Sequence, residues 1–308
     1  MKNSLIFISI LASIAFFSFS KPRKPVLDLE GLKNATKVGF SYIPPGKTII
    51  DNDTIACEGF FMSKMEVSNF NYQEYLDDLK KAGKMDEYKL ALVDSAKWNS
   101  TYFQGDKYVQ HYFNHKAYKN YPVVNLTRQQ AEKYCEWLTQ VWRKYTQNPS
   151  LVFRLPKRTE FLRAANGTSL YRPYAWDFPY LRSQKGKMMA NFLRIDGGAI
   201  TRDTVTGKFR IAINDFDFLG NEAEYADVTA PVQSYLPNEF GVYNLNGNVS
   251  EMVQEKNIAV GGDWYSPGYD IRNQSTKKFT EANPMVGFRP VMTFTESSKG
   301  EKGSKSSK

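Results

Sequence analysis

Two kinds of side chain that often carry catalysis or bind metals are scarce in this chain. It has only two cysteines, Cys57 and Cys135, and only two histidines, His111 and His115. The i, i+4 spacing of the histidines could place both rings on one helical face, as in some zinc enzymes, but no Glu follows the first histidine. We therefore expect two exposed or half-buried histidines, and the count excludes any mechanism that needs three histidine ligands. Whether Cys57 and Cys135 form a disulfide stays open, because sequence does not show proximity.

The net charge of +9 would be typical of a nucleic-acid-binding protein, but the distribution of the charge argues against that function. Seven of the nine net positive charges lie near the ends of the chain, at Lys2, in the run 21–24 and in the tail 297–308. The body between them is nearly neutral, so its composition indicates no phosphate-binding surface. Apolar residues make up 42% of the chain, which is enough for a large core. We expect a folded protein that binds no nucleic acid.

The first 20 residues are typical of a secretory signal peptide. Lys2 is followed by the apolar stretch 5–17 and then by a short segment with small residues. The stretch is shorter than the roughly 20 apolar residues that a membrane-spanning helix needs. We therefore expect residues 1–20 to be cleaved, although an uncleaved anchor remains the alternative, and we expect no membrane span in the mature chain. Residues 21–35 are predicted to be a linker and 297–308 a disordered basic tail, because neither can build a core.

Three helices are predicted from periodic apolar residues and N-terminal signals. Ser68 is a candidate N-cap for a helix over 69–81, and Thr127 forms a capping box with Gln130 at the start of a longer helix. A proline then precedes a short helix that runs through Ala165. Beyond that helix Gly, Pro and Asn interrupt every apolar segment, so short strands and irregular structure should dominate the second half.

Seven segments of the chain, in the correct order, resemble the formylglycine-generating-enzyme family, also called the sulfatase-modifying factor family. Each segment alone is a weak indication, whereas the shared order from about residue 40 to residue 292 is specific. The segments are YIPPG (42–46), FFMSKMEVSN (60–69), YPVVN with AEKYCEWL (121–125 and 131–138), RLPKRTEFLRAA (154–165), NEFGVYNLNGNVSE (238–251), GGDW (261–264) and GFRPV (287–291).

The resemblance implies an α+β fold. The expected architecture is the compact formylglycine-generating-enzyme domain, a distant variant of the C-type-lectin arrangement with little regular secondary structure. We expect this domain to occupy residues 36–296.

The resemblance also implies bound calcium. The family's calcium site falls on the side chains of Asn244 and Glu251 and on the carbonyl groups of Gly247 and Val249. Oxygen donors from an irregular loop suit Ca²⁺, which takes six to eight of them. The alternative is a tight turn in which Glu251 forms a salt bridge. A second calcium site is implied at Asn191, Phe192, Glu224 and Ala226.

The chain departs from the family where oxidative chemistry would occur. The oxidases of the family use two cysteines just beyond the Gly-Gly turn, and the aligned positions here are Ser266 and Ile271. Paired thiolates bind Cu(I) and exchange with a substrate cysteine, which neither replacement can do. We therefore expect no copper. A related branch uses three histidines and iron on an added helical domain, and two histidines exclude that reading.

This departure favours a non-catalytic domain, a pseudoenzyme, that acts as a structural or interaction component of the bacterial cell envelope. The gliding-motility and type IX secretion proteins of the family are similar to this chain in that respect. Those proteins are lipoproteins, whereas no cysteine follows the apolar stretch here. We therefore expect an exported protein, periplasmic or held at the outer membrane through partner proteins of the envelope.

Two alternatives stay open. The chain could be a family enzyme with altered chemistry in which Ser266 is the nucleophile, although no histidine lies near it in sequence. It could instead be a module that binds glycans or another ligand through exposed rings such as Trp264, Tyr265 and Tyr269.

Overall fold

A computed structural model of the chain describes residues 39–100, 105–194, 200–207, 209–211 and 228–295. The predicted signal peptide, linker and basic tail lie outside these residues. None of the helices in the described part of the chain is both long and apolar enough to cross a membrane.

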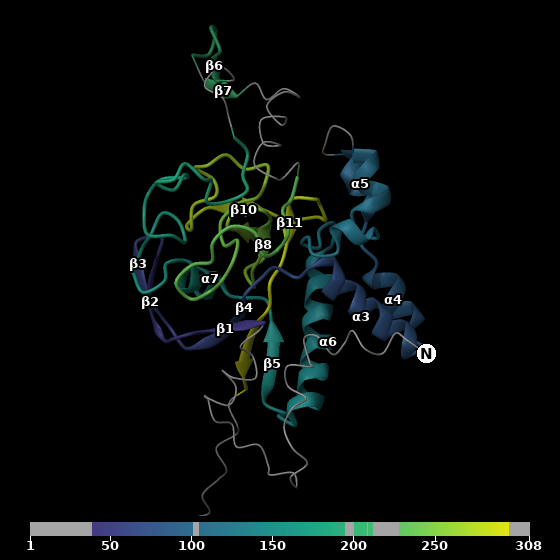
Figure 1. Cartoon of the computed structure of the whole chain (residues 1–308). Coiled ribbons are helices and arrows are strands. Elements are labelled where there is room, and N and C mark those ends of the chain that lie inside the picture. The colour runs from purple at the N-terminus through teal and green to yellow at the C-terminus, as the bar shows by residue number, and fades with distance from the viewer. Residues whose placement is uncertain (1–38, 101–104, 195–199, 208, 212–227, 296–308) are drawn as a thin grey trace, which may run out of the picture.

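Two small sheets form the centre of the fold (Figure 1). The first is antiparallel, and it joins segments from the two ends of the described chain because β12 pairs with both β4 and β5. Its order is β1 (Phe40–Ile43), β4 (Phe60–Ser63), β12 (Val291–Phe294) and β5 (Leu151–Arg154).

The second sheet contains only strands of two or three residues, and β11 and β8 pair in parallel. Its order is β10 (Thr276–Lys278), β9 (Ile258–Val260), β8 (Ser250–Met252) and β11 (Val286–Gly287). Two hairpins complete the strands, namely β2 (Gly46–Ile50) with β3 (Asp53–Cys57) and β6 (Ile200–Arg202) with β7 (Phe209–Ile211).

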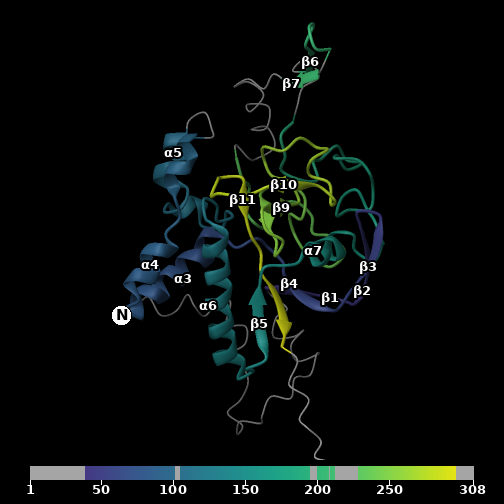
Figure 2. The ribbon, with the colours of Figure 1, turned by 180° about the vertical axis from the view of Figure 1, so that it is seen from behind.

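The helices lie on two sides of the sheets, as both views show (Figure 2). On one side are α3 (Asn69–Lys81), α4 (Met85–Ala91), α5 (Gly105–His111) and α6 (Arg128–Thr146). On the other side is α7 (Arg158–Ala165), close to β2 and β3. Two short 3₁₀ helices, η1 (Ser95–Ser100) and η2 (Lys116–Tyr118), connect the elements of the first side.

The three predicted helices are confirmed. The Ser68 hydroxyl accepts from the Asn71 amide at the start of α3, and Thr127 and Gln130 form the reciprocal capping box of α6. The short helix α7 ends at Ala165. Helices α4 and α5 are not predicted from the sequence, because each has only seven residues and too few apolar positions to show a helical period.

Aromatic rings dominate the core between α3, α6 and the first sheet. Tyr72 stacks on Tyr134 with ring centroids 5.7 Å apart, and Phe288 meets Tyr134 edge-on at 5.4 Å. A separate apolar cluster lies between the first sheet and α7 and includes Phe161 and Met62. Beyond α7 the described residues contain short strands and no helix, as the frequent Gly, Pro and Asn residues predict.

Candidate functional site

The segment 244–249, just before β8, is a turn built from residues that tolerate left-handed backbone. Asn244, Gly247 and Asn248 all have positive φ, at 51°, 74° and 62°. Asn and Gly adopt this conformation at low cost. A Cβ atom at residue 247 would lie 2.2 Å from the carbonyl oxygen of Asn191, so only glycine allows this close approach.

The two asparagines of the turn reach back to a buried carboxylate on the other side of the sequence. The Asn248 amide donates to Glu66 Oε1 at 2.8 Å, and the Asn244 amide donates to Glu66 Oε2 at 3.2 Å. Asn248 is fully buried, and its Oδ1 also accepts from the Ala230 amide at 2.7 Å. Side-chain amide hydrogen bonds therefore fix the turn, together with the buried Leu245 and Val249.

A buried ion pair lies beside this network. Arg289 donates to both carboxylate oxygens of Glu251, at 2.5 and 2.7 Å, and neither side chain is exposed. The guanidinium also donates to the carbonyl groups of Ser63, Lys64 and Tyr243. Charge and hydrogen-bonding capacity of Arg289 are thus both satisfied inside the protein.

The Arg289 guanidinium is the positive charge near two buried carboxyl groups, those of Glu66 and Glu251. Burial raises the pKa of Glu66 to about 7, and the nearby Glu251 adds to the increase while Arg289 opposes it. Burial also raises the pKa of Glu251, again opposed by Arg289. The cluster of Glu66, Glu251 and Arg289 has no net charge when one of the two carboxyls carries a proton. Arg289 forms its ion pair with Glu251, so Glu66 is the carboxyl that more readily holds the proton.

The structure brings the four predicted calcium ligands Asn244, Gly247, Val249 and Glu251 into one turn and the strand that follows it. Their oxygen atoms fit calcium by kind. However, both oxygens of Glu251 already accept from Arg289, so a Ca²⁺ ion would share this carboxylate with a guanidinium. Within the described residues, no three His, Cys, Asp or Glu side chains form a group that could hold a metal ion. Calcium at this turn stays a prediction.

The second predicted calcium site is only partly described. Asn191 is buried, its carbonyl accepts from the Asn248 amide at 2.7 Å, and its own side-chain amide donates to the Val228 carbonyl. Phe192 follows it in an apolar cluster. Glu224 and Ala226 lie outside the described residues, so the ligand set as a whole stays a prediction.

Ser266 and Ile271, which the resemblance aligns with the two cysteines of the family's oxidases, are both buried. Ser266 is 6% exposed, its amide donates to the Asp263 carbonyl, and its own carbonyl accepts from Leu193. Ile271 is fully buried in an apolar cluster, and its carbonyl accepts from the Asn246 amide at 2.7 Å. These backbone bonds hold the loop between them in place without any thiol.

Neither cysteine of the chain compensates for this loss. Cys57 and Cys135 are free thiols in separate apolar clusters, so the disulfide that the sequence left open does not form. Burial raises the pKa of Cys57 to about 11 and that of Cys135 further. Both remain protonated near neutral pH and are therefore poor nucleophiles and poor metal ligands. The two histidines are exposed, as predicted, with ring centroids 5.8 Å apart.

A second buried charge lies near Ser266. Asp263, in the GGDW segment, accepts from the Ser250 hydroxyl at 2.8 Å and from Lys277 at 2.7 Å, and its side chain is not exposed. Its other oxygen accepts from the Tyr265 amide at 3.1 Å. This arrangement holds the segment in front of Ser266 through charge, and it places no general base at the serine hydroxyl.

Beside the 244–246 turn is a hollow of about 360 Å³. Its walls combine the half-buried Trp176 and Arg172 with Glu239 and the exposed Leu236. Arg172 pairs with Glu239 across it at 3.2 Å. The hollow is open and charged, and its position next to the turn makes it part of the same site.

One of the rings proposed for ligand binding is placed differently by the structure. Trp264 is 2% exposed, because its indole stacks near Trp98 and donates to the Pro284 carbonyl at 3.1 Å. Trp264 therefore does not supply an exposed ring to the alternative of a ligand-binding module. Tyr265 is half-buried, whereas Tyr269 is 68% exposed and lies 4.2 Å from the Arg272 guanidinium.

Sequence reasoning missed the roles of Glu66, Asn248 and Arg289, although each lies in a quoted segment. The available signal was a charged or amide residue inside an otherwise apolar motif, such as Glu66 in FFMSKMEVSN. Such a residue is costly to bury unless it has partners. The partners themselves are 182 residues apart for Glu66 and Asn248, so the pairing could not be found from spacing.

Comparisons with known proteins show the family of the chain. The family described as "Sulfatase-modifying factor enzyme 1-like domain" matches residues 33–294. The chain is 24% identical to formylglycine-generating enzyme of Mus musculus over 259 residues, which are 76% of this chain and 55% of that protein. It is 30% identical to formylglycine-generating enzyme of Streptomyces coelicolor over 151 residues, which are 49% of this chain and 34% of that protein. The chain thus spans about half the length, or less, of these relatives.

Three solved structures share the fold, each with a TM-score of 0.50. PvdO from Pseudomonas aeruginosa is 17% identical, with 83% of this chain and 94% of that chain covered. CarF is 16% identical, with 83% and 98% covered. Variable protein 1 of Treponema denticola is 13% identical, with 82% and 94% covered. At these identities the likeness concerns the mixed helix-and-sheet fold alone, and it confirms the predicted fold class.

Proposed function

The chain belongs to the sulfatase-modifying factor enzyme 1-like family, and from this premise we propose that it is a non-catalytic member that acts as a structural or interaction component of a bacterial cell envelope. The observation that carries the proposal is the pair Ser266 and Ile271, which occupies the positions of the two cysteines used by the family's oxidases. Both are buried, and Ile271 packs among Ala190, Phe192 and Tyr174. Neither side chain can form a thiolate, so copper has no soft ligand there.

The alternative of a serine-based enzyme has less support. A serine nucleophile needs a base within hydrogen-bond reach. Asp263, three residues before Ser266, bonds to Lys277 at 2.7 Å and also accepts from the Ser250 hydroxyl. His111 and His115 lie in and just after α5, on the helical side.

Export and the envelope location rest on the signal-like residues 1–20, and gliding motility or type IX secretion is the finer form of the same proposal. In this form the protein reaches the periplasm or the outer membrane and is retained there by partner proteins. The neutral body supports protein partners over nucleic acid.

The first experiment tests the absence of the family reaction. The purified protein, incubated with a sulfatase-type cysteine peptide with and without copper, should give no aldehyde product by mass spectrometry. The Streptomyces coelicolor enzyme serves as the positive control under the same conditions. Aldehyde above the level without protein, especially if lost in Cys57→Ser or Cys135→Ser, would overturn the proposal.

The second experiment tests the interaction role. Cross-linking in native envelopes, followed by affinity purification of the tagged chain, should recover partner proteins in stoichiometric amounts. Ser266→Ala is a matched control, because an interaction role does not need the hydroxyl, whereas a serine-based enzyme does. Recovery of the chain alone from both envelope and periplasm would contradict the envelope role.

We also propose that the turn containing Asn244, Gly247, Val249 and Glu251 binds calcium. Chelation should then lower the melting temperature and added calcium should restore it, since an ion at a hundredfold its dissociation constant stabilises the fold by about 2.7 kcal/mol. Glu251→Gln should weaken binding, because affinity for a hard cation follows ligand charge. If millimolar calcium gives no heat of binding and leaves the melting curve unchanged, the calcium proposal is wrong. Arg289 is then the cation that neutralises Glu251.

A further inference from the structure

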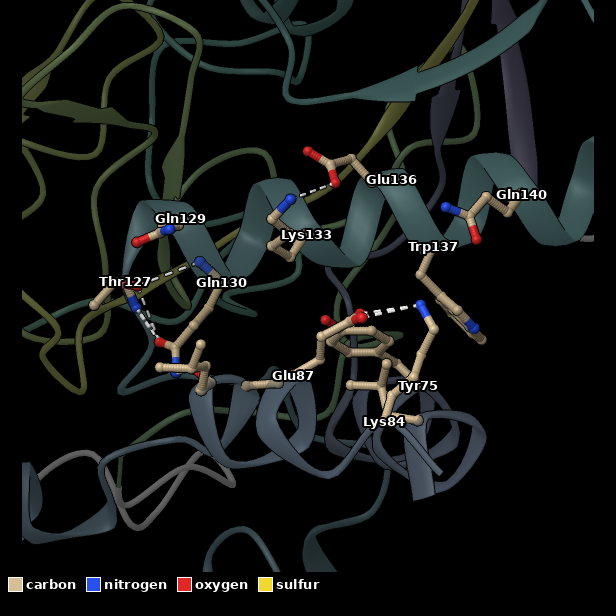
Figure 3. Close-up of a pocket in the computed structure, with 13 residues that line it drawn as sticks. Tyr75, Lys84, Glu87, Thr127, Gln129, Gln130, Lys133, Glu136, Trp137 and Gln140 are labelled. Carbon is tan, nitrogen blue, oxygen red and sulfur yellow. Dashed lines mark hydrogen bonds and ion pairs between the residues drawn. The ribbon is translucent and has the colours of Figure 1, made fainter. Parts of the chain in front are cut away.

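A second groove lies on the helical side of the molecule and is formed by residues 75–140, which are distant in sequence from the 244–251 turn. It is bounded by α6 on one side and by α4 with the end of α3 on the other, and its volume is about 460 Å³ (Figure 3). That volume is within the range of small-ligand sites. The groove shares no lining residue with the hollow beside the 244–246 turn.

The lining of this groove combines apolar surface with many polar side chains. Three of its thirteen side chains are aliphatic, two are aromatic and eight are polar or charged, but most of the surface exposed in the groove is apolar. Gln129 and Gln140 are exposed and can both donate and accept, whereas the Gln130 side chain is already bonded to Thr127, Leu90 and Leu92. This combination suits a ligand that has both hydroxyl groups and apolar C–H faces.

The aromatic part of the groove is held in a fixed orientation. Trp137 is half-buried in α6, its indole N–H donates to Asp78 Oδ2 of α3 at 3.1 Å, and its ring lies 5.4 Å from that of Tyr75. A ring fixed in this way loses little entropy when a ligand lies against it. The face of an aromatic ring carries negative potential and attracts the C–H edge of a neighbouring group.

The charges on the two rims cancel. Lys84 pairs with Glu87 at 3.1 Å beside α4, and Lys133 pairs with Glu136 at 2.7 Å on α6. All four side chains are exposed, so the pairs contribute little to stability but present charged donors and acceptors to a ligand. Two lysines and two glutamates give no net charge, which favours a neutral ligand over an anionic one.

Tyr75 supplies a hydrogen-bonding group at the base of the groove. Its side chain is 4% exposed, and its hydroxyl has no hydrogen-bond partner within the part of the chain that the structure describes. Burial, helped by the carboxylates of Glu87 and Glu136, raises the pKa of Tyr75 to about 12. The phenol therefore stays protonated and offers a donor beside two carboxylate acceptors.

From the fixed indole, the balanced charges, the glutamines and the unpartnered phenol, we propose that this groove binds a neutral carbohydrate. The apolar face of one pyranose ring lies on Trp137, and its hydroxyl groups bond to Gln129, to Gln140 and to the two lysine–glutamate pairs. The inference goes beyond the proposed envelope role and does not depend on Ser266 or Ile271.

The test uses the full-length protein and a printed array of neutral and acidic oligosaccharides, followed by calorimetric titration with the neutral oligosaccharide that binds best. Trp137→Ala should weaken that binding at least tenfold, whereas Trp137→Phe, which keeps a ring face, should weaken it only a few-fold. Trp176→Ala is the matched control, because it removes a half-buried tryptophan from the other hollow and should leave binding unchanged.

A second variant guards against loss of folding in Trp137→Ala. Gln129→Ala combined with Gln140→Ala changes two exposed side chains and should weaken binding several-fold with an unchanged melting temperature. Absence of binding to any neutral oligosaccharide, binding only to acidic ones, or full binding by Trp137→Ala would overturn the proposal. Occupancy of the groove by a peptide in place of sugar would overturn it as well.

Discussion

Around Tyr72 and Tyr134, between α3 and α6, the interior is made of aromatic rings, whereas around Glu66 and Glu251 it is made of amides and charges. We refer to these regions as the ring core and the polar core. Regular helices with good caps position the ring core. Left-handed asparagines and close-packed glycines position the polar core. One domain thus combines a core whose stability depends on filled volume with a core whose stability depends on matched hydrogen-bond and charge partners.

The largest effect should come from removing one member of the buried ion pair in the polar core. Arg289→Met keeps much of the length but leaves the Glu251 carboxylate without its donor and removes one donor from each of three carbonyl groups. Breaking a buried pair in this way costs about 3–5 kcal/mol, which denaturant unfolding would measure. Adding Glu251→Met should recover much of the loss, because the unpaired charge is then gone. If Arg289→Met alone lowers the free energy of unfolding by less than about 1 kcal/mol, the polar core does not depend on matched partners as we propose.

The ring core should respond to volume instead. Leu76 in α3 is buried in the large apolar cluster, and Leu76→Ala should cost about 2–5 kcal/mol because it leaves a cavity. Leu76→Met keeps the volume and should cost less than about 1.5 kcal/mol in the same unfolding measurement. Equal losses for the two variants would show that shape, rather than volume, controls this region.

Stability should fall as the pH rises through neutrality, and the polar core should be the main cause. The pKa of Glu66 is about 7 in the folded protein and ordinarily 4.5, so between these values the folded state holds a proton that the unfolded state has released. This stabilisation is complete below about pH 4.5 and is lost as the pH rises past 7, by at most about 3 kcal/mol.

A matched pair of variants assigns this pH dependence to one core. Burial also raises the pKa of Glu74, on α3, to about 7, but that side chain is partly exposed and solvent reduces its effect. Unfolding measured between pH 5 and pH 8 should therefore flatten more in Glu66→Gln than in Glu74→Gln. Stability that increases over this range in the unchanged protein would contradict the assignment.

The smallest effect concerns a helix end beside the ring core. The Thr127 hydroxyl accepts from the Gln130 amide at 3.3 Å, and the Gln130 side chain accepts from the Thr127 amide at 2.7 Å. Thr127→Ala removes half of this box and should lower the free energy of unfolding by about 1 kcal/mol. Thr127→Ser is the control and should retain most of the stability.

The ring core was largely predictable from the sequence, and the polar core was not. Ser68 and Thr127 mark helix starts because capping acts over three residues, so the signal is local. The residues of the 244–251 turn could be named through the resemblance, yet their hydrogen-bond partners could not. Glu251 and Arg289 are 38 residues apart, and Asn244 and Glu66 are 178 apart, so only the folded chain shows which charge meets which.

The position of Arg289 has a consequence for how the protein is made. Its guanidinium bonds to the Ser63 carbonyl, 226 residues earlier, and β12, which follows it, supplies the middle of the first sheet. A nascent chain therefore cannot close the first sheet or neutralise its buried carboxylates until nearly all of the domain has been synthesised. Contacts of such long range slow folding. Synthesis of most of the chain can thus finish before the native structure forms.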